Sequence, residues 1–387
     1  MKRLLAAALA ALCLAALPAC GAAKTEESVP VQEEAPAPPP EPTPEELAAQ
    51  EIDDLLASLT TEEKVGQLFF VRCPAESAVE DVTTYHLGGY VLFGRDFADK
   101  TADAVIQTLR DYQEAAAADT GIPLLLGVDE EGGTVVRVSS NPHLRSEKYR
   151  SPQKLLSAGG TEALVADTDD KDALLSALGI NVNLAPVADV STSSADFIYD
   201  RTCGLDASGT AECIRAVVEQ MASDGMGSVL KHFPGYGSNV DTHTGIAVDN
   251  RSLDQFRAAD FLPFSAGMEA GGGKAAVLVS HNIMTAVDDA LPASLSPAVH
   301  DLLRTELGFD GVVMTDDLAM DAVAAYAEDG AVAVMALQAG NDLIITTDYR
   351  TQIPKVLEAL EAGTLSMDTI DTACRRLLTW KQSLGLL

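Results

Sequence analysis

Most of the residues that could do chemistry in this chain come directly after short apolar runs. The polar groups that follow five such runs are Asp129, Glu130, Glu131, Arg137, Asp189, Arg201, Lys231, His232, His281, Asp316 and Asp317. Charged groups at the ends of apolar runs cost desolvation energy unless they are paired. We therefore interpret the set as functional. Carboxylates, imidazoles and cations are suited to proton transfer, nucleophilic attack and binding of oxygen-rich ligands.

The tripeptide Asp241-Thr242-His243 lies in a glycine-containing loop soon after Lys231. An Asp two residues before a His can accept a hydrogen bond from one ring nitrogen, which leaves the other nitrogen able to exchange protons. One alternative is a surface loop with an incidental His. A second alternative is a metal site built from Asp189, His232, His243 and Asp316. No HxH or HExxH pattern supports that site, and we expect neither a metal nor a cofactor.

Each of the other polar residues also has a structural alternative. Asp316 can cap the helix after its strand, although the adjacent Asp317 can supply that cap instead. Glu130 and Glu131 can form salt bridges to Arg137. The remaining alternatives are a surface ion pair for Lys231 and hydrogen-bonded core positions for His232 and His281.

Eight short apolar runs predict the strands that would position these residues. They are Leu68–Val71, Tyr90–Phe93, Leu124–Val128, Val182–Ala185, Ser228–Leu230, Ala275–Ser280, Val312–Thr315 and Leu343–Thr346. Amphipathic segments between them, such as Thr101–Ala118, Ala211–Asp224 and Ala322–Ala339, predict helices. Strands that alternate with helices pair in parallel. Eight such units predict a single catalytic domain with the (β/α)8 TIM-type barrel fold, whose active site forms at the C-terminal ends of the strands.

Local signals support this division into elements. Thr60 and Glu63 have the spacing of a capping box, and Gly340 is placed to end a helix. Thr369–Leu387 predicts a closing helix. Glycines at 132, 133, 235 and 237 permit positive φ and close approach of the backbone to a ligand.

The N-terminal residues predict export. Residues 1–20 combine a basic start with an apolar run that ends in Leu17-Pro18-Ala19-Cys20, which is typical of a signal peptide with a lipobox. We expect lipidation of Cys20 and an extracytoplasmic protein anchored to a bacterial cell membrane by lipid alone; the alternative is simple cleavage and release. Residues 21–45 are rich in Pro and Glu and predict a disordered tether. Residues 46–387 then form the barrel.

Composition excludes some partners. The formal net charge of −32 speaks against nucleic acid, which needs a basic surface. The cysteines outside the export signal are Cys73, Cys203, Cys213 and Cys374, with no CxxC pair. They predict buried thiols, with a single bridge left open. We expect a monomer.

Several long motifs resemble glycoside hydrolase family 3. They are Asp129–Gly133, Gly179–Val190, Lys231–Gly235 and Gly308–Met320. With Asp241-Thr242-His243, they resemble the β-N-acetylglucosaminidase (β-N-acetylhexosaminidase) branch, and the similarity runs from about Leu55 to the C-terminus.

The resemblance implies a retaining exo-glycosidase that removes terminal β-linked N-acetylglucosamine from cell-wall (muropeptide) or related glycans. Asp316 matches the nucleophile, and His243, oriented by Asp241, matches the acid/base. The positions that match those holding the sugar are Asp129, Arg137, Arg201, Lys231 and His232. The Asp–His dyad takes the place of the second carboxylate that most retaining glycosidases use.

Two departures from the family pattern bear on specificity. Tyr236 stands where a second His is usual, and the loop from Lys231 to His243 is one residue shorter. Two rival functions remain: a β-glucosidase or β-xylosidase on the same barrel, and a non-catalytic sugar-binding lipoprotein. The dyad argues against the first, because those branches use a carboxylate acid. The nucleophile and dyad together argue against the second.

Overall fold

The computed structural model describes residues 42–239, 247–324, 326–327 and 330–387. The predicted signal peptide, Cys20 and nearly all of the predicted tether lie outside the described residues. So do Asp241 and His243. Pro44–Leu387 forms one compact unit.

Eight parallel strands form the centre of this unit, in the order β10-β1-β2-β3-β4-β5-β7-β9. Their bounds are β1 Phe69–Arg72, β2 Gly89–Leu92, β3 Leu125–Val128, β4 Val182–Asn183, β5 Gly227–Phe233, β7 Ala275–Val279, β9 Val313–Thr315 and β10 Ile344–Thr346. A parallel bridge between Met314 and Leu343 joins the last two strands, so the sheet closes on itself. All eight predicted strands and the predicted barrel are therefore confirmed.

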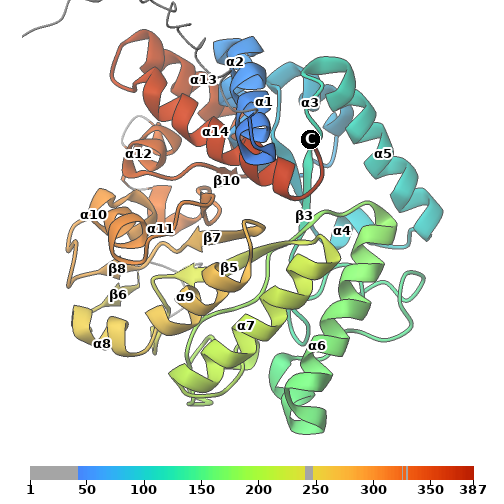
Figure 1. The fold of residues 1–387 in the computed structure, drawn as a ribbon, viewed down its shortest axis with the longest axis vertical. Coiled ribbons are helices and arrows are strands. Elements are labelled where there is room, and N and C mark those ends of the chain that lie inside the picture. Colours follow the sequence, from blue (N-terminus) through green and yellow to red (C-terminus); the bar gives the residue numbers. More distant parts are fainter. Residues whose placement is uncertain (1–41, 240–246, 325, 328–329) are drawn as a thin grey trace, which may run out of the picture. The chain divides into compact units, whose positions relative to one another are not determined.

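Helices surround the strands in chain order, so that the colours of Figure 1 run around the ring from blue to red. Their bounds are α1 Pro44–Ser58, α2 Thr61–Gln67, α3 Ala78–Tyr85, α4 Gly94–Phe97, α5 Ala102–Asp119, α6 Pro152–Leu178, α7 Ala207–Asp224, α8 Leu253–Ala258, α9 Phe261–Ala270, α10 Pro297–Asp301, α11 Asp321–Ala324, α12 Val332–Ala339, α13 Tyr349–Glu361 and α14 Met367–Ser383. Short helical turns lie at Tyr199–Arg201, Ala293–Leu295 and Leu302–Glu306.

The predicted helices begin and end close to the observed bounds, with one exception. The single helix predicted over Ala322–Ala339 is wrong, because α11 ends at Ala324 and α12 begins at Val332. In the described part of this segment, Gly330 has a φ of 77° and donates its N–H to Ala327 O. Periodicity alone missed this break, because alanines continue on both sides of it.

Both predicted helix-end signals are confirmed. Thr60 caps α2 and exchanges hydrogen bonds with Glu63, at 2.7 and 3.2 Å. Gly340 ends α12 with a φ of 114°, and its N–H donates to the carbonyls near the end of that helix. A left-handed residue at this position favours glycine.

The core lies between the strands and the helices and inside the barrel. Phe69, Phe70 and Tyr90 are fully buried there. Gly127 on β3 makes room for Phe70, since a Cβ at this position would lie 2.4 Å from the Phe70 ring. No helix in the described ranges is long and apolar enough to cross a membrane.

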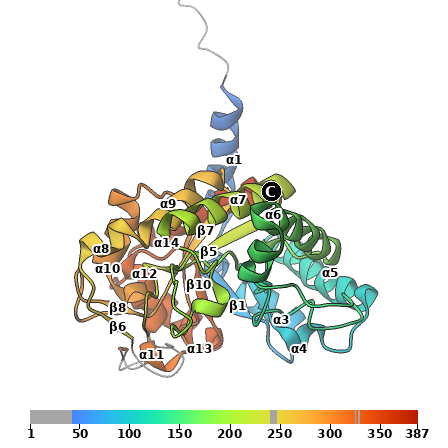
Figure 2. The same cartoon turned by 90° about the horizontal axis from the view of Figure 1, so that it is seen from below.

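A small parallel sheet at one end of the barrel was not predicted. It pairs β6 Val248–Asp249 with β8 Ile283–Met284. Figure 2 shows β6, β8 and α11 at the end of the barrel opposite α1. Both strands are two residues long, and no periodic pattern can be read over that length.

Candidate active site

A pocket of about 360 Å³ lies at the C-terminal ends of the strands. All six predicted site residues that the structure describes line it; they are Asp129, Arg137, Arg201, Lys231, His232 and Asp316. Its volume is in the range of small-molecule sites, roughly 300–1,000 Å³. The barrel therefore brings together side chains from β5 and from the segments after β3, β4 and β9, as the position of the polar residues predicted.

Glu131 is the centre of the charged network in this pocket. Its Oε1 lies 2.6 Å from Lys231 Nζ, and its two oxygens accept from Arg201 Nε and Nη2 at 2.9 and 2.8 Å. Lys231 Nζ also donates to Asp129 Oδ1 at 2.6 Å. Only 3% of the Glu131 and Lys231 side chains is exposed. Two carboxylates and two cations are thus paired before any ligand arrives.

These pairings hold the groups in their charged forms. Burial by itself acts to raise the pKa of Glu131, but the charges of Lys231 and Arg201 outweigh it and hold that pKa well below its usual range. Burial likewise acts to lower the pKa of Lys231, and Asp129 and Glu131 raise it above the ordinary value. The pocket therefore presents fixed charges near neutral pH.

His232 is held in one orientation by Asp189. The ring Nδ1 lies 2.8 Å from Asp189 Oδ2, and Arg201 Nη2 lies 3.2 Å from the other nitrogen, Nε2. A carboxylate can only accept, so Nδ1 carries the proton and Nε2 accepts from Arg201. The other Asp189 oxygen accepts from Tyr236 N at 2.7 Å. The alternative of a hydrogen-bonded core histidine describes part of this geometry, but His232 also lines the pocket.

A β-bulge brings two consecutive residues of β5 to the same pocket. Leu230 pairs with Val277 and Phe233 pairs with Val279, so Lys231 and His232 lie opposite one residue of β7. Neighbours in a regular strand point to opposite faces. The bulge changes that alternation, and both side chains reach the pocket.

Glu130 and Glu131 do not form the salt bridges to Arg137 that the alternative assigned to them. Glu130 accepts from the backbone N–H groups of Arg137 and Val138, each at 2.7 Å, and so shapes the following loop. Arg137 Nη2 instead lies 3.8 Å from Asp129 Oδ2. The sequence placed these residues in one loop but did not show which charges meet.

Asp316 and Asp317 differ in their environments. Asp317 binds its own loop and the next one: Oδ1 accepts from Ala319 N and Thr347 N, and Oδ2 accepts from Thr347 Oγ1 at 2.7 Å. Asp316 Oδ1 accepts from Asp317 N at 2.8 Å. Both residues line the pocket. Neither residue caps the next helix, because α11 begins only at Asp321. Of the two pocket residues, Asp317 is therefore the one that holds the loops together.

His281, the last of the polar residues singled out, is a core residue. It is fully buried, with Nδ1 2.8 Å from Ser294 Oγ and Nε2 3.1 Å from the carbonyl of Asp317. The backbone carbonyl can only accept, so Nε2 donates to it. His281 thus supports the segment that carries Asp316.

Arg72 is a pocket residue that sequence reasoning missed. It ends β1, and its guanidinium carbon lies 4.2 Å from the centroid of the Phe93 ring; the guanidinium of Arg137 lies over the same ring at 5.3 Å. Within the described residues, the buried Nε of Arg72 has no hydrogen-bond partner. An ionisable residue at the end of the first apolar run was the available signal. The partner roles of Glu131 and Asp189 were missed as well.

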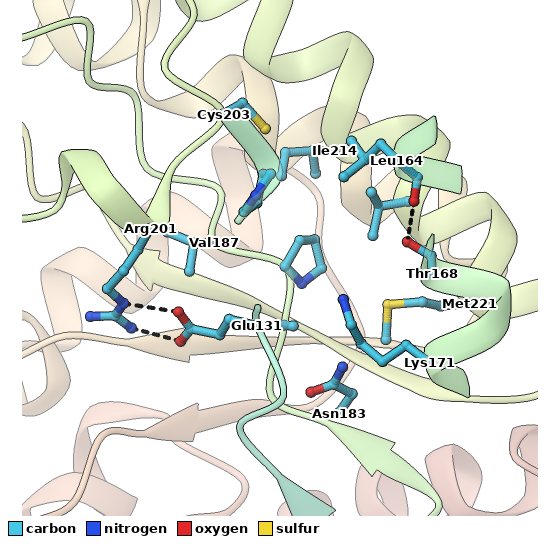
Figure 3. A pocket seen from close by; sticks show the side chains of 14 residues that line it. Glu131, Leu164, Thr168, Lys171, Asn183, Val187, Arg201, Cys203, Ile214 and Met221 are labelled. Atoms are coloured by element: carbon cyan, nitrogen blue, oxygen red, sulfur yellow. Dashed lines mark hydrogen bonds and ion pairs between the residues drawn. The ribbon is translucent and has the colours of Figure 1, made fainter. Parts of the chain in front are cut away.

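A separate cavity lies beside the pocket and shares Glu131 and Arg201 with it (Figure 3). Its volume of about 30 Å³ is far below the roughly 300 Å³ at which ligand pockets begin. Most of its other lining is apolar and includes Leu164 of α6 and Met221 of α7. The cavity is a packing space behind the ion pair, and the chemistry belongs to the larger pocket.

All four predicted glycines have positive φ. The close approach that they permit is to the protein itself rather than to the pocket. A Cβ at Gly132 would lie 2.3 Å from Arg150 O, and one at Gly235 would lie 2.2 Å from Asp260 Oδ1. The positive φ of these glycines was predicted correctly. The close neighbours found for them are protein atoms, whereas a ligand was expected.

The four cysteines in the described residues are free and buried. The prediction of buried thiols is confirmed for Cys73, Cys203, Cys213 and Cys374, and the bridge that was left open is not formed in this structure.

Known proteins resemble this chain over most of its length. Residues 60–380 match the glycosyl hydrolase family 3 N terminal domain. An uncharacterized secreted glycosyl hydrolase of Arthroderma benhamiae is 28% identical over 320 residues, which are 79% of this chain and 87% of that protein. Beta-hexosaminidase LpqI of Mycobacterium tuberculosis is 32% identical over 338 residues, which are 84% of each chain.

Solved structures have the same fold. The structure of LpqI superposes with a TM-score of 0.76 over 85% of this chain and 96% of that chain. A family 3 beta-N-acetylglucosaminidase from Paenibacillus sp. str. FPU-7 is 32% identical, with a TM-score of 0.78 over 85% of this chain. This chain spans 63% of that longer protein. Because the family match covers the whole barrel and the pocket residues lie within it, the chain belongs to glycoside hydrolase family 3 and is a glycoside hydrolase of the β-N-acetylhexosaminidase type.

Proposed function

We propose that this protein is a retaining exo-β-N-acetylglucosaminidase with Asp316 as its nucleophile. One observation carries the proposal: Asp316 lines the same pocket as the paired charges of Asp129, Glu131, Lys231 and Arg201. A sugar bound there meets carboxylates that accept from its hydroxyls and cations that donate to its oxygens. The β-hexosaminidase and beta-N-acetylglucosaminidase relatives support N-acetylglucosamine as that sugar.

The reaction takes two displacement steps. In the first step, an Asp316 oxygen bonds to the anomeric carbon, the glycosidic bond breaks, and His243 gives its proton to the leaving oxygen. In the second step, neutral His243 removes a proton from water, which attacks the anomeric carbon and releases Asp316. Asp241 orients the imidazole. The roles of Asp241 and His243 come from their positions in the sequence, since both lie outside the described residues.

The charged network contributes by being arranged before the sugar binds. Groups that are already held in place need no reorganisation when charge develops in the transition state. Lys231 and Arg201 share Glu131, and Arg201 also reaches the ring of His232. We infer that Lys231, Arg201, His232, Asp129 and Arg137 bind the hydroxyls and the N-acetyl group.

Two variants and one product analysis test this function. Asp316→Ala should abolish turnover of an aryl β-N-acetylglucosaminide. His243→Ala should slow it strongly, but less for a leaving group that needs no proton. NMR of the first product should show the β-anomer. Near-normal turnover by Asp316→Ala, or an α-anomer as first product, would overturn the assignment.

Rates on different sugars separate the rival functions. A β-glucosidase or β-xylosidase would hydrolyse aryl glucosides or xylosides faster than the aryl N-acetylglucosaminide. A non-catalytic sugar-binding lipoprotein would bind sugars tightly and hydrolyse none of them. We expect instead that the N-acetylglucosaminide is hydrolysed fastest.

Arg72 supports a cell-wall fragment as the natural substrate. Its guanidinium lines the pocket on the face of Phe93, and Nε has no partner among the described residues. It also lines an adjoining pocket of about 410 Å³ together with Arg95 and Arg350. Cations beyond the sugar site suit a leaving sugar that carries a carboxylate, as muramic acid does.

Paired disaccharides test the substrate. Arg72→Met should lower kcat/KM about tenfold on N-acetylglucosaminyl-N-acetylmuramic acid, since a hydrogen bond to a charged group contributes roughly 1.5–3 kcal/mol. The same variant should change kcat/KM little on uncharged diacetylchitobiose. Equal losses on both disaccharides would remove the support for an anionic leaving sugar.

The N-terminal residues lead us to propose that the protein lies outside the cytoplasm and is attached to the membrane through lipid on Cys20. We propose separately that it is a monomer. The secreted relative supports export. Mass spectrometry of the N-terminal peptide should detect a diacylglycerol on Cys20, and Cys20→Ala should release the protein from the membrane fraction. Release of unmodified wild-type protein would instead support simple cleavage.

A further inference from the structure

A cluster of charged side chains joins the two ends of the loop that follows β5. The outgoing end, from Gly235 to Asn239, and the returning end, from Ala247 to Arg251, are described by the structure. Residues 240–246 between them, with Asp241 and His243, are not. The two described ends thus flank the proposed acid/base in the sequence.

Arg251 contacts both ends of the loop. On the returning end, its Nε and Nη2 donate to Asp249 at distances between 2.8 and 3.1 Å. On the outgoing end, Nη2 donates to the carbonyl of Gly235 at 3.3 Å. Asn239 Nδ2 also donates to Asp249 Oδ2, at 2.7 Å. Asp249 and Arg251 therefore bind the two ends to each other.

The same guanidinium also binds both loop ends to Asp260, the residue directly before α9. Arg251 Nη1 donates to Asp260 Oδ2 at 2.7 Å, and only 1% of the Asp260 side chain is exposed. The Arg251 guanidinium also lies 4.2 Å from the ring centroid of Phe256 on α8. A planar guanidinium with several donors can serve three acceptors at once, which an ammonium group does with less geometric control.

The outgoing end of the loop packs tightly against this cluster. A Cβ at Gly237 would lie 2.6 Å from Arg251 Cζ, and one at Gly235 would lie 2.2 Å from Asp260 Oδ1. The intervening Tyr236 donates its N–H to Asp189, which holds the pocket residue His232. The loop end is therefore fixed between the Arg251 cluster and the pocket.

We propose that Arg251 is a positioning residue for proton transfer: it binds to Asp260 both described ends of the loop whose sequence carries His243. The inference rests on the proposed function of His243. Arg251 is not among the described residues that line the pocket. Its loss should therefore act on the step that needs a proton donor.

Aryl β-N-acetylglucosaminides with good and poor leaving groups test this inference. The ratio kcat/KM reports steps up to the first displacement, where a poor leaving group needs a proton and a good one does not. General acid catalysis contributes roughly 10²–10⁴-fold. We expect Arg251→Met to lower kcat/KM at least about tenfold for the poor leaving group and less than about threefold for the good one. Arg251→Lys should restore part of the loss.

Arg257 on α8 offers a matched control. It forms a two-bonded ion pair with Glu306, but 46% of its side chain is exposed and it touches neither loop end. Arg257→Met should leave kcat/KM unchanged for both substrates. Should Arg251→Met fail to fold, Asn239→Ala removes only the side-chain hydrogen bond from Asn239 to Asp249. This variant should lower kcat/KM more for the poor leaving group than for the good one, by a smaller factor than Arg251→Met.

The outcomes separate this inference from the proposed function. If His243→Ala depends on the leaving group and Arg251→Met does not, the positioning role is wrong and the function stands. If His243→Ala itself shows no such dependence, the acid/base assignment fails. An equal loss on both substrates in Arg251→Met would indicate a general structural role and would also overturn the inference.

Discussion

Lys231 Nζ and Glu131 Oε1 lie 2.6 Å apart, with 3% of each side chain exposed. The two residues come from β5 and from the segment after β3, and each has a second partner of opposite charge in the pocket. Burial of unpaired charges would be unfavourable, so the network forms as a unit. Its members are bound to one another when the sugar arrives.

Removal of the shared cation should destabilise the protein. Lys231→Met leaves Asp129 without its closest cation and Glu131 with Arg201 alone, so we expect the free energy of unfolding to fall by about 3–5 kcal/mol. Urea unfolding measures this change. Lys64, which pairs with the partly exposed Asp371, is the matched control, and Lys64→Met should cost less than about 1 kcal/mol.

A second substitution should recover part of that loss. In the double variant Lys231→Met/Glu131→Gln, the uncompensated carboxylate of Glu131 is removed together with the cation. We expect the double variant to be more stable than Lys231→Met. A double variant as unstable as the sum of both single variants would show that the two charges are not coupled.

The adjacent acids Asp316 and Asp317 should respond differently to substitution. Asp316→Ala should lower kcat by about 10⁴-fold or more, as loss of a nucleophile does, with little change in stability. Asp317→Ala removes bonds to Thr347 and Ala319, so it should lower the melting temperature and leave measurable turnover. Steady-state kinetics and thermal unfolding of both variants compare the roles. If Asp317→Ala lost turnover and Asp316→Ala lost only stability, the two proposed roles would have to be exchanged.

Asp172 should make stability depend on pH. Burial of Asp172 on α6, to which the nearby Asp224 and Asp169 add, raises its pKa to about 8, although Lys171 opposes the shift. The folded protein thus binds a proton that the unfolded chain releases, so this contribution is present at low pH and is lost as pH rises through about 8. Relative to Asp172→Asn, wild type should lose on the order of 2 kcal/mol between pH 6 and pH 9. Urea unfolding of both proteins at both pH values measures this loss. If the difference in unfolding free energy between wild type and Asp172→Asn were the same at pH 6 and pH 9, the raised pKa of Asp172 would be contradicted.

Lys381 should make stability depend on pH in the direction opposite to that of Asp172. Its burial on α14 lowers the pKa to about 7, and Nζ donates to Gln67 Oε1 at 2.9 Å. The unfolded chain binds more protons above pH 7, so stability from this group rises with pH toward the ordinary lysine pKa of about 10.4. Lys381→Met should be more stable than wild type at pH 7, with an advantage that shrinks by pH 9.5. An advantage that does not change with pH would contradict this account.

The eight strands and most of the helix ends could be predicted from the sequence because their signals are local. Apolar runs, caps such as Thr60 and C-terminal glycines such as Gly340 act over a few residues. The barrel rule then placed Asp129, Lys231 and Asp316 at one end of the strands. This reasoning failed for the short strands β6 and β8, which leave no periodic signal, and at the break between α11 and α12.

Which charges meet was decided only by the tertiary structure. Glu131 was weighed as a partner of Arg137, yet it pairs with Arg201 and Lys231, which are distant in the chain and adjacent only once the barrel closes. The bulge that brings Lys231 and His232 to one pocket depends on the register of β5 against β7. Arg251 acquires its role from Gly235 and Asp260 in the same way. Residue type limited the chemistry of these groups, and packing of distant segments determined their partners.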